Sequence, residues 1–356
     1  MKRILITGGC GFIGSNLAVD LVSRGYAVTV LDNLSRRGSE FLRARVLAHG
    51  VTVVHGDIRD PENLKGLGGD FALMIECSAE SSAQTGSGPG DARYLLDVNL
   101  LGAINCFEWA RERKVPVIFF SSSRIYPYDR INACRYVENE TRFDLAQSSS
   151  GITPVGVQVQ MPLDGVRTLY GASKLSAELI LREYGARYEL PSIINRCGVV
   201  AGPWQLGKID QGVFTFWLAS HFFKRPLNYT GFGGLGKQVR DLLHVDDLSS
   251  LVARQVQCLV DDDPVFRGEV FNVGGSAGVT LSLKETTAIC AQLTGHRLEI
   301  GSVAPTRPGD LIWYVTDNGR TAEAFDWKPS RSAQDILQDT FQWIRGHADD
   351  LKDIMV

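Results

Sequence analysis

The chain has no long apolar run, no closely spaced pair of cysteines and no sustained stretch of lysine and arginine. A membrane-spanning helix needs about 18 consecutive apolar residues, so we expect no membrane span. Seven widely spaced cysteines without a CxxC motif favour neither a disulfide framework nor a zinc site. A formal net charge of -3 without a basic stripe offers little attraction for a nucleic-acid backbone. These absences predict a protein of the reducing cytoplasm that binds no metal, no membrane and no nucleic acid.

The composition is that of a folded globular protein, because 44% of the residues are hydrophobic and 22% are charged. No repeat of fixed period and no low-complexity tract interrupts it. The opening residues, "MKRILITGG", already have the pattern of a core strand, so we expect no signal peptide. A length of 356 residues fits one large α/β unit and a smaller lobe.

Short β-branched runs alternate with amphipathic stretches of helical length. The predicted strands cover residues 3–7, 27–32, 51–57, 71–76, 115–120 and 192–196. The predicted helices lie near 12–25, 91–113, 168–187, 246–260 and 282–294. Strands that alternate with helices form a parallel sheet with right-handed crossovers. The predicted fold class is therefore α/β, a Rossmann-type doubly wound parallel sheet with a smaller C-terminal α/β lobe.

The segment "ITGGCGFIGSNL" places Gly8, Gly11 and Gly14 between the first predicted strand and the helix that follows it. In this context glycine lets the chain turn tightly, lets the backbone approach a pyrophosphate and packs the helix against the strand. The helix N-terminus adds unpaired N–H groups that bind phosphates. A packing turn without a ligand is the alternative, but the flanking strand and helix favour a dinucleotide site.

Asp32 ends the second predicted strand, 18 residues after Gly14. A carboxylate there accepts the hydroxyls of the adenosine ribose and repels a 2'-phosphate, so the sequence favours NAD over NADP. Arg36 and Arg37 complicate this choice, because a nearby arginine accommodates that phosphate. Asp57 ends the third predicted strand and either meets the adenine or caps the helix of "PENLKGL".

The segment "YGASK" puts Tyr170 and Lys174 four residues apart, on one face of a predicted helix. The ammonium favours the phenolate, which makes the tyrosine a usable general base. The same spacing is common on solvated helices, so the pair alone leaves both interpretations open. The segment "FFSSSRIY" ends the fifth predicted strand, at the sheet edge that carries ligands. A serine there holds a substrate hydroxyl, relays its proton, or simply forms a turn.

Together with "DNLSRRG", "HGDIRD", "VNLLGAINCFEWAR", "RDLLHVDDL", "FNVGG", "RPGD" and "FDWKP", these motifs resemble the extended short-chain dehydrogenase/reductases over nearly the whole chain. Within them the chain is similar to the NAD-dependent nucleotide-sugar epimerases and dehydratases. Residues 127–167 are too long for an ordinary connection between a strand and a helix, which indicates a substrate or lid loop. The resemblance implies a NAD-binding domain mainly in residues 1–200. It implies a nucleotide-sugar-binding lobe mainly in residues 201–356, with some chain crossing back.

The resemblance also implies roles for individual residues. Counting back four residues from Tyr126 makes Ser122 the catalytic hydroxyl and Ser123 its neighbour, beside Tyr170 and Lys174. The implied cofactor-binding residues are Gly8, Gly11, Phe12, Ile13, Gly14, Asp32, Asn33, Arg36, Asp57, Ile58, Tyr170 and Lys174. The implied substrate-binding residues are Glu80, Arg124, Asn195, Gln211, Arg240, Arg307 and Asp310.

Arg240 and Arg307 are implied ligands of the substrate's diphosphate, and guanidinium forks suit phosphate oxygens. Either arginine could instead form a structural ion pair with its neighbour Asp241 or Asp310. Asn99 resembles the family's structural asparagine at a helix bend.

In the family scheme Tyr170 removes a sugar hydroxyl proton while hydride passes to NAD, and the fate of the ketosugar separates the subfamilies. The 4,6-dehydratases carry Asp-Glu after the catalytic threonine, where this chain has Ser123 and Arg124. The segments "DNLSRRG", "DQGVFTFW" and "GKQVRDLLHVDDL" resemble the CDP-paratose (CDP-tyvelose) 2-epimerases, which predicts a 2-epimerase. The alternatives are UDP-sugar 4-epimerisation, dehydration with Glu80 near the site, and a non-catalytic NAD sensor or scaffold.

Three departures from the family pattern bear on the substrate. "ECSAES" replaces an H-L-A-type strand end that abuts the cofactor, and "SSSRIYP" replaces a Thr-Asn-Lys version. Cys197 and Gly198 follow Arg196 where bulkier polar residues are common, and we interpret Cys197 as a buried structural thiol. The resemblance further implies a homodimer built on the helices at 91–113 and 168–187, although a stripe buried inside the monomer would have the same pattern.

Overall fold

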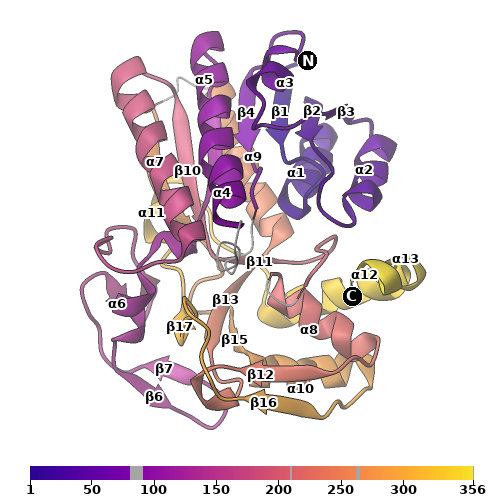
Figure 1. Ribbon diagram of the computed structural model, residues 1–356, viewed down its shortest axis with the longest axis vertical. Helices are drawn as coiled ribbons and strands as arrows, with labels where there is room; N and C mark the ends of the chain where they lie inside the picture. The colour runs from indigo at the N-terminus through magenta and orange to yellow at the C-terminus, as the bar shows by residue number, and fades with distance from the viewer. Residues whose placement is uncertain (81–90, 209–210, 262–264, 356) are drawn as a thin grey trace. The chain divides into compact units, whose positions relative to one another are not determined.

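A computed structural model describes residues 1–80, 91–208, 211–261 and 265–355 (Figure 1). Ser81 of "ECSAES" and Asp210 of "DQGVFTFW" lie outside the described residues. The chain forms two compact units that alternate along the sequence. Unit 1 comprises Met1–Ile125, Leu169–Arg196 and Ser249–Phe271, and unit 2 comprises Tyr126–Thr168, Cys197–Leu248 and Asn272–Val356.

Unit 1 is built around a seven-stranded sheet of order β14-β10-β5-β4-β1-β2-β3. Its strands are β1 (Arg3–Thr7), β2 (Ala27–Asp32), β3 (Thr52–His55), β4 (Leu73–Glu76), β5 (Val117–Ser122), β10 (Ser192–Cys197) and β14 (Arg267–Val273). The neighbours from β5 to β3 pair in parallel. The strand order reverses between β1 and β4, and such a switch point is where doubly wound sheets bind their ligands. The predicted fold class is confirmed.

The helices that accompany this sheet are α1 (Phe12–Ser23), α2 (Ser39–Ala48), α3 (Pro61–Lys65), α4 (Asp91–Leu96), α5 (Ala103–Arg113) and α7 (Leu169–Tyr188). The helix α9 (Val245–Val260) begins in unit 2 and continues in unit 1. Helices α4, α5 and α7 lie side by side (Figure 1). The strands β4 and β5 are buried at every residue, because helices cover both faces of such a sheet.

Two local details of unit 1 differ from the sequence prediction. The single helix predicted over 91–113 is interrupted by a π-helix at Asp97–Gly102, which separates α4 from α5. The N-cap of α3 is Asp60, whose side chain accepts the Glu62 N–H at 3.0 Å. The suggestion that Asp57 caps this helix was therefore wrong, because Pro61 at the first helical position places the cap one residue before it.

Unit 2 contains the long segment 127–167 and most of the chain after Arg196. Within 127–167 lie α6 (Tyr128–Asn132), a hairpin of β6 (Tyr136–Glu138) with β7 (Phe143–Leu145), and a second of β8 (Ile152–Thr153) with β9 (Gly156–Val157). The other strands are β11 (Val199–Ala201), β12 (Leu227–Thr230), β13 (Val239–His244), β15 (Thr280–Ser282), β16 (Ile300–Val303) and β17 (Trp313–Tyr314). The other helices are α8 (Val213–Phe222), α10 (Leu283–Thr294), α11 (Gly319–Phe325), α12 (Ala333–Gly346) and α13 (Ala348–Ile354).

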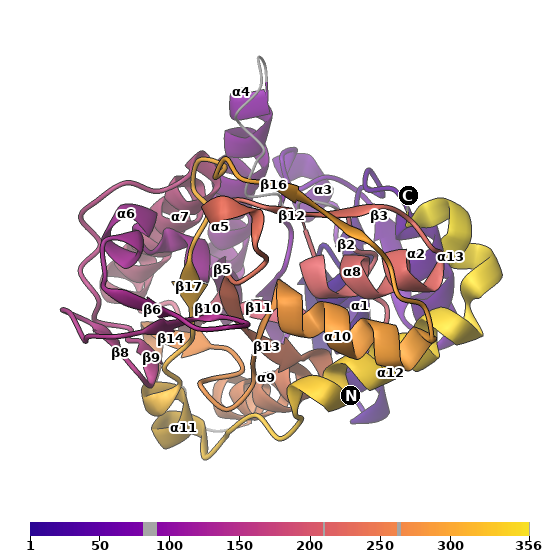
Figure 2. The same cartoon turned by 90° about the horizontal axis from the view of Figure 1, so that it is seen from below.

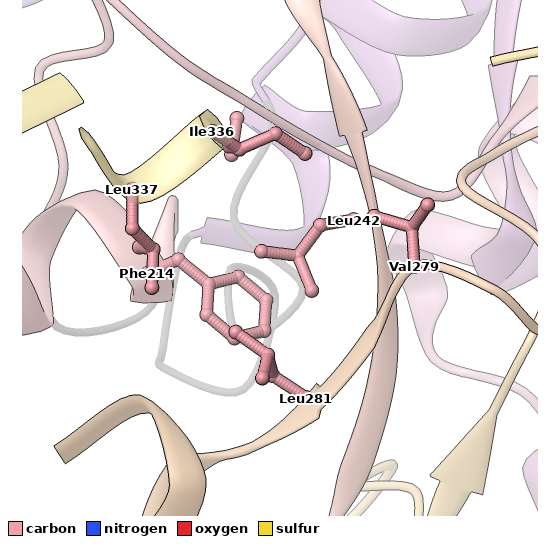
Figure 3. Close-up of a cluster of buried hydrophobic side chains, with 7 residues drawn as sticks. Phe214, Leu242, Val279, Leu281, Ile336 and Leu337 are labelled. Atoms are coloured by element: carbon pink, nitrogen blue, oxygen red, sulfur yellow. The ribbon is translucent and has the colours of Figure 1, made fainter. Parts of the chain in front are cut away.

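The core of unit 2 lies between its helices and a small mixed sheet. Strand β13 is the centre of this sheet, parallel to β11 and β17 and antiparallel to β15. Helices α8, α10 and α12 lie together against it (Figure 2). Their apolar side chains meet those of the sheet in one cluster (Figure 3), formed by Ala201, Phe214, Leu242, Val279, Leu281, Ile336 and Leu337. Among the described residues, no helix is both long and apolar enough to span a membrane.

Candidate functional site

The glycine-rich turn between β1 and α1 has the geometry that a dinucleotide requires. Gly8 has a φ of +67°, and a Cβ on it would lie 2.9 Å from the backbone of Ser78. A Cβ on Gly14 would lie 2.4 Å from the carbonyl oxygen of Gly8, so only glycine lets α1 approach the turn this closely. Helix α1 starts at Phe12, and no side chain caps its N-terminus. The N–H groups in the first turn of α1, which includes Ile13, are the groups that a helix N-terminus offers to a phosphate.

Asp32, at the end of β2, is fixed against this turn. Its Oδ2 accepts the N–H of Cys10 at 2.9 Å, and its Oδ1 accepts the N–H of Leu34 at 2.8 Å. Burial raises the pKa of Asp32, and these two backbone hydrogen bonds oppose the shift. The carboxylate thus stands beside the glycine-rich turn, at the strand end where a dinucleotide's ribose is predicted to lie. Arg36 is half-buried in the loop between β2 and α2.

Asn33 and Asp57 come together at the ends of β2 and β3. The Asn33 amide donates to Asp57 Oδ2 at 2.9 Å, and Arg59 forms an ion pair with the same carboxylate at 2.7 Å. Burial alone would raise the pKa of Asp57, but the hydrogen bonds from Arg59 and Asn33 prevail and lower it to about 2. Asp57 is therefore ionised at neutral pH, and the adjacent Ile58 is buried.

The proposed catalytic side chains lie at the junction of β5 and α7. Ser122 is the last residue of β5, and its Oγ accepts the Arg124 N–H at 3.2 Å. Ser123 begins a 3-10 helix, Ser123–Ile125, against which α7 packs. Tyr170 is the second residue of α7, with Lys174 one turn later, and both are buried. The structure thus brings the helix of Tyr170 and Lys174 to the strand end that carries Ser122.

The surroundings of Lys174 contain a carboxylate that the sequence analysis did not single out. Lys174 Nζ lies 3.9 Å from Oε2 of Glu76 and 4.2 Å from the centre of the Phe119 ring. Glu76 ends β4, is completely buried, and accepts the Ser78 N–H at 2.9 Å through Oε1. Burial raises the pKa of Glu76 to about 7, although Lys174 acts to lower it. The departure from the family pattern at "ECSAES" was the available signal for this residue.

Glu80 and Asn99 are linked through backbone hydrogen bonds. The Glu80 N–H donates to the Asn99 side chain at 2.8 Å, and the Asn99 amide donates to the Glu80 carbonyl at 2.9 Å. Asn99 lies in the π-helix, and its amide also reaches Ser173 Oγ at 3.4 Å. Asn99 therefore fastens the bend in this helix to the segment that follows β4, and the Glu80 side chain is half-buried.

Asn195 lies in β10 and is completely buried. Its amide exchanges two hydrogen bonds with Gln255, at 2.8 and 2.9 Å. Because both polar ends are used within unit 1, a structural role suits this side chain better than contact with a substrate. The Cys197 thiol lies at the end of the same strand and is buried.

The remaining predicted substrate residues lie in unit 2. Arg240 forms an ion pair with Asp310 at 2.9 Å and donates to the Leu311 carbonyl at 2.7 Å. The ion pair thus joins Arg240 to the carboxylate that was the predicted neighbour of Arg307. Arg307 is partly exposed, and its carbonyl accepts the Asp310 N–H at 3.1 Å. The backbones of Gln211 and Lys208 form an isolated antiparallel β-bridge. Among the described residues, no cluster of histidine, cysteine or acidic side chains is arranged to hold a metal ion.

Comparison with known proteins agrees with this geometry. The NAD dependent epimerase/dehydratase family matches residues 4–274. The chain is 30% identical to the CDP-paratose 2-epimerase of Salmonella typhi, over 96% of this chain and 98% of that one. It is 26% identical to a UDP-glucose 4-epimerase of Erwinia amylovora, over 96% and 97% of the two chains. The structure of the Thermus thermophilus UDP-glucose 4-epimerase in complex with NAD is 27% identical, with a TM-score of 0.76 over 97% and 99% of the chains. The prediction of NAD as the cofactor is confirmed, and the chain belongs to the NAD-dependent epimerase/dehydratase family.

Proposed function

We propose that the protein is an NAD-dependent nucleotide-sugar epimerase that inverts C2 of a CDP-linked sugar of the paratose and tyvelose type. The epimerase assignment rests on the two residues that follow Ser122, which are Ser123 and Arg124. A dehydratase needs an acid and a base to expel a sugar hydroxyl, but Ser123 offers a buried hydroxyl and Arg124 a guanidinium. The similarity to a CDP-paratose 2-epimerase supports the choice of sugar and carbon.

The chain's own residues supply binding and proton transfer. The turn from Gly8 to Gly14 and the carboxylate of Asp32 hold NAD, which when bound accepts a hydride from the sugar and later returns it. Tyr170, as phenolate, takes the proton of the sugar hydroxyl and gives it back after the hydride returns. Lys174 favours the phenolate, since an ammonium one helix turn away is on the same face. Ser122 donates a hydrogen bond to the sugar oxygen, because its own oxygen already accepts the Arg124 N–H.

Two arginines of unit 2 are the proposed ligands of the diphosphate. Arg240 is held in place by Asp310 and the Leu311 carbonyl, which fixes the direction of its guanidinium. Arg307 stands in the same turn as Asp310 and is partly exposed. A fixed and an accessible guanidinium suit a diphosphate, because the planar fork binds two phosphate oxygens at once. Glu80, Arg124 and Gln211 are the proposed contacts of the remaining substrate.

A homodimer is also part of the proposal. Four large apolar side chains are exposed along the adjacent elements α4, the π-helix and α7: Tyr94, Leu101, Leu179 and Tyr188. Exposed apolar side chains that gather on neighbouring helices favour a partner surface. This is the set of helices on which the family resemblance places a dimer.

The test is to incubate the purified protein with NAD and CDP- or UDP-hexoses in deuterated water, and to identify products by NMR and mass spectrometry. We expect a C2 epimer of the CDP sugar without deuterium on carbon, because the hydride returns internally. A C4 epimer of a UDP sugar would contradict the proposed subfamily. Loss of water, with deuterium at C5 where the solvent proton enters, would contradict epimerisation altogether.

The control variant is Tyr170→Phe, which keeps the ring and removes the proton acceptor. We expect its turnover to fall by at least about 10²-fold, the usual contribution of a general base. Binding of NAD without turnover by the wild type would leave a sensor or scaffold as the function.

A further inference from the structure

The carboxylate of Glu76 is placed to act on the reaction through Lys174. Family members usually carry an H-L-A-type strand end where this chain has "ECSAES", so the resemblance supplies no role for this glutamate. Glu76 is 0% exposed and Lys174 is 2% exposed, and their charged atoms lie 3.9 Å apart. Two opposite charges this close and this well shielded from water interact strongly.

The elements packed around Glu76 contribute groups that bear on its charge, except β5, which pairs Glu76 with the uncharged Phe119. Strand β1 contributes Thr7, the chain after β4 contributes the Ser78 N–H, and α5 contributes Cys106. Burial and the negative charge of Glu76 raise the pKa of the Cys106 thiol, which therefore stays neutral. Helix α7 contributes Lys174, the charged group of this set. Burial thus raises the pKa of Glu76 to about 7, while Lys174 and the hydrogen bonds from Ser78 and Thr7 act to lower it.

We propose that Glu76 is a positioning residue that sets the net positive charge presented to Tyr170 by Lys174. This rests on the proposed function, in which Tyr170 is the proton acceptor. When Glu76 is protonated, its carboxyl does not offset the charge of the ammonium, which then acts more strongly on the phenol one helix turn away. When Glu76 is ionised, the pair is neutral overall, and the phenolate is favoured less.

The direction of the effect follows from these charges. In the wild type, Glu76 loses its proton as the pH rises through about 7, so Tyr170 needs a higher pH to ionise than it would if Glu76 were uncharged. Glu76→Gln keeps the size and removes the charge. We expect Tyr170 to ionise about one pH unit lower in this variant, which is about tenfold in the phenolate fraction at a given pH.

The first experiment measures tyrosinate absorbance against pH, with neither substrate nor turnover involved. The wild type and Glu76→Gln are each titrated together with their Tyr170→Phe counterparts, and subtraction isolates the signal of Tyr170. Glu112→Gln is the matched control, since it removes the same charge from an exposed position of α5. We expect a shift in Glu76→Gln and none in Glu112→Gln. Identical titrations of wild type and Glu76→Gln would overturn the proposal.

The same shift should appear in the acidic limb of kcat/KM against pH once the substrate is known. Glu76→Asp restores the negative charge and should move the titration back toward the wild type. If Glu76→Asp behaves like Glu76→Gln, the effect is one of packing and the proposal fails. Because the absorbance titration needs no substrate, failure of the proposed epimerisation and failure of this inference are distinguishable.

A measurement on the wild type covers the case in which Glu76→Gln does not fold. Carboxyl NMR of protein labelled at its glutamates should show one signal that titrates near neutral pH, well above the usual value of about 4.3. If no glutamate titrates above its usual range, Glu76 stays charged throughout and the proposal is overturned.

Discussion

Of the three consecutive serines at positions 121–123, the first two end β5 and differ in what their hydroxyls contact. The family pattern selects the second as catalytic, so we predict different effects of substitution. Ser121 donates to the buried carboxylate of Glu178, whereas Ser122 accepts the Arg124 N–H and keeps its own proton to donate. We expect Ser122→Ala to lower kcat by about 10²-fold with little change in KM, as for loss of a proton-relay group. We expect Ser123→Ala to lose less than about tenfold.

The measurement is steady-state kinetics of both variants with the sugar identified from the product analysis. Thermal unfolding of each variant serves as the control for folding. A larger loss in Ser123→Ala than in Ser122→Ala would show that the count back from Tyr126 selects the wrong serine.

The residues that the sequence identified, and those that it missed, differ in how far apart their partners lie along the chain. Tyr170 and Lys174 are four residues apart, so helix geometry alone places them together. Glu76 and Lys174 contact each other from β4 and α7, and no spacing in the sequence reveals this. For the same reason the sequence does not reveal that the Asn195 amide pairs with Gln255 on α9.

At the scale of elements, the periodicity of apolar residues predicted those strands and helices whose bounds depend on the local sequence alone. The strands β1 and β2 have the predicted bounds, because each is a short β-branched run bordered by turn residues. The bend that the family resemblance places at Asn99 lies in the π-helix Asp97–Gly102, where Asn99 exchanges hydrogen bonds with the backbone of Glu80. Periodicity alone gave one continuous helix there, because these contacts join separate segments of the chain. The two hairpins within 127–167 were also missed, because strands of two or three residues have too few positions to show an alternation.

The close packing of α1 on the glycine-rich turn predicts that Gly14→Ala impairs unit 1. A Cβ at Gly14 would lie 2.4 Å from the Gly8 carbonyl and 2.8 Å from Gly9 Cα, and these backbone atoms cannot rotate away. We expect a loss of about 1–3 kcal/mol in the free energy of unfolding, despite the higher helix propensity of alanine, together with weaker NAD binding.

Chemical denaturation and NAD titration monitored by fluorescence are the measurements for this variant. Gly68→Ala is the matched control, because nothing lies within 4 Å of a Cβ at that position. Gly14→Ala would contradict the assignment of this turn if it bound NAD as tightly as Gly68→Ala.

At the scale of the whole molecule, each unit is assembled from three separate segments of the chain. Contacts between distant segments build both units, so a single boundary placed along the sequence describes them incompletely. The sheet of unit 1 takes β10 and β14 from beyond residue 190, where the local strand pattern gives no information on their neighbours. Sequence therefore indicates the elements and their type, while the order of the last strands depends on long-range packing.

The exposed apolar side chains on α4, the π-helix and α7 predict that the protein is a dimer in solution. Leu101 is 44% exposed and Leu179 is 51% exposed, and the elements that carry them are packed together. Burial of such side chains against a second copy is favourable because it removes apolar surface from water, whereas an aspartate at either position would have to be buried without a partner. We expect the wild type to sediment as a dimer and the double variant Leu101→Asp with Leu179→Asp as a monomer. Leu235→Asp, at a residue of unit 2 that is 44% exposed, should remain dimeric. If the wild type is a monomer, or if the double variant stays dimeric, these side chains do not form a subunit interface and the prediction is wrong.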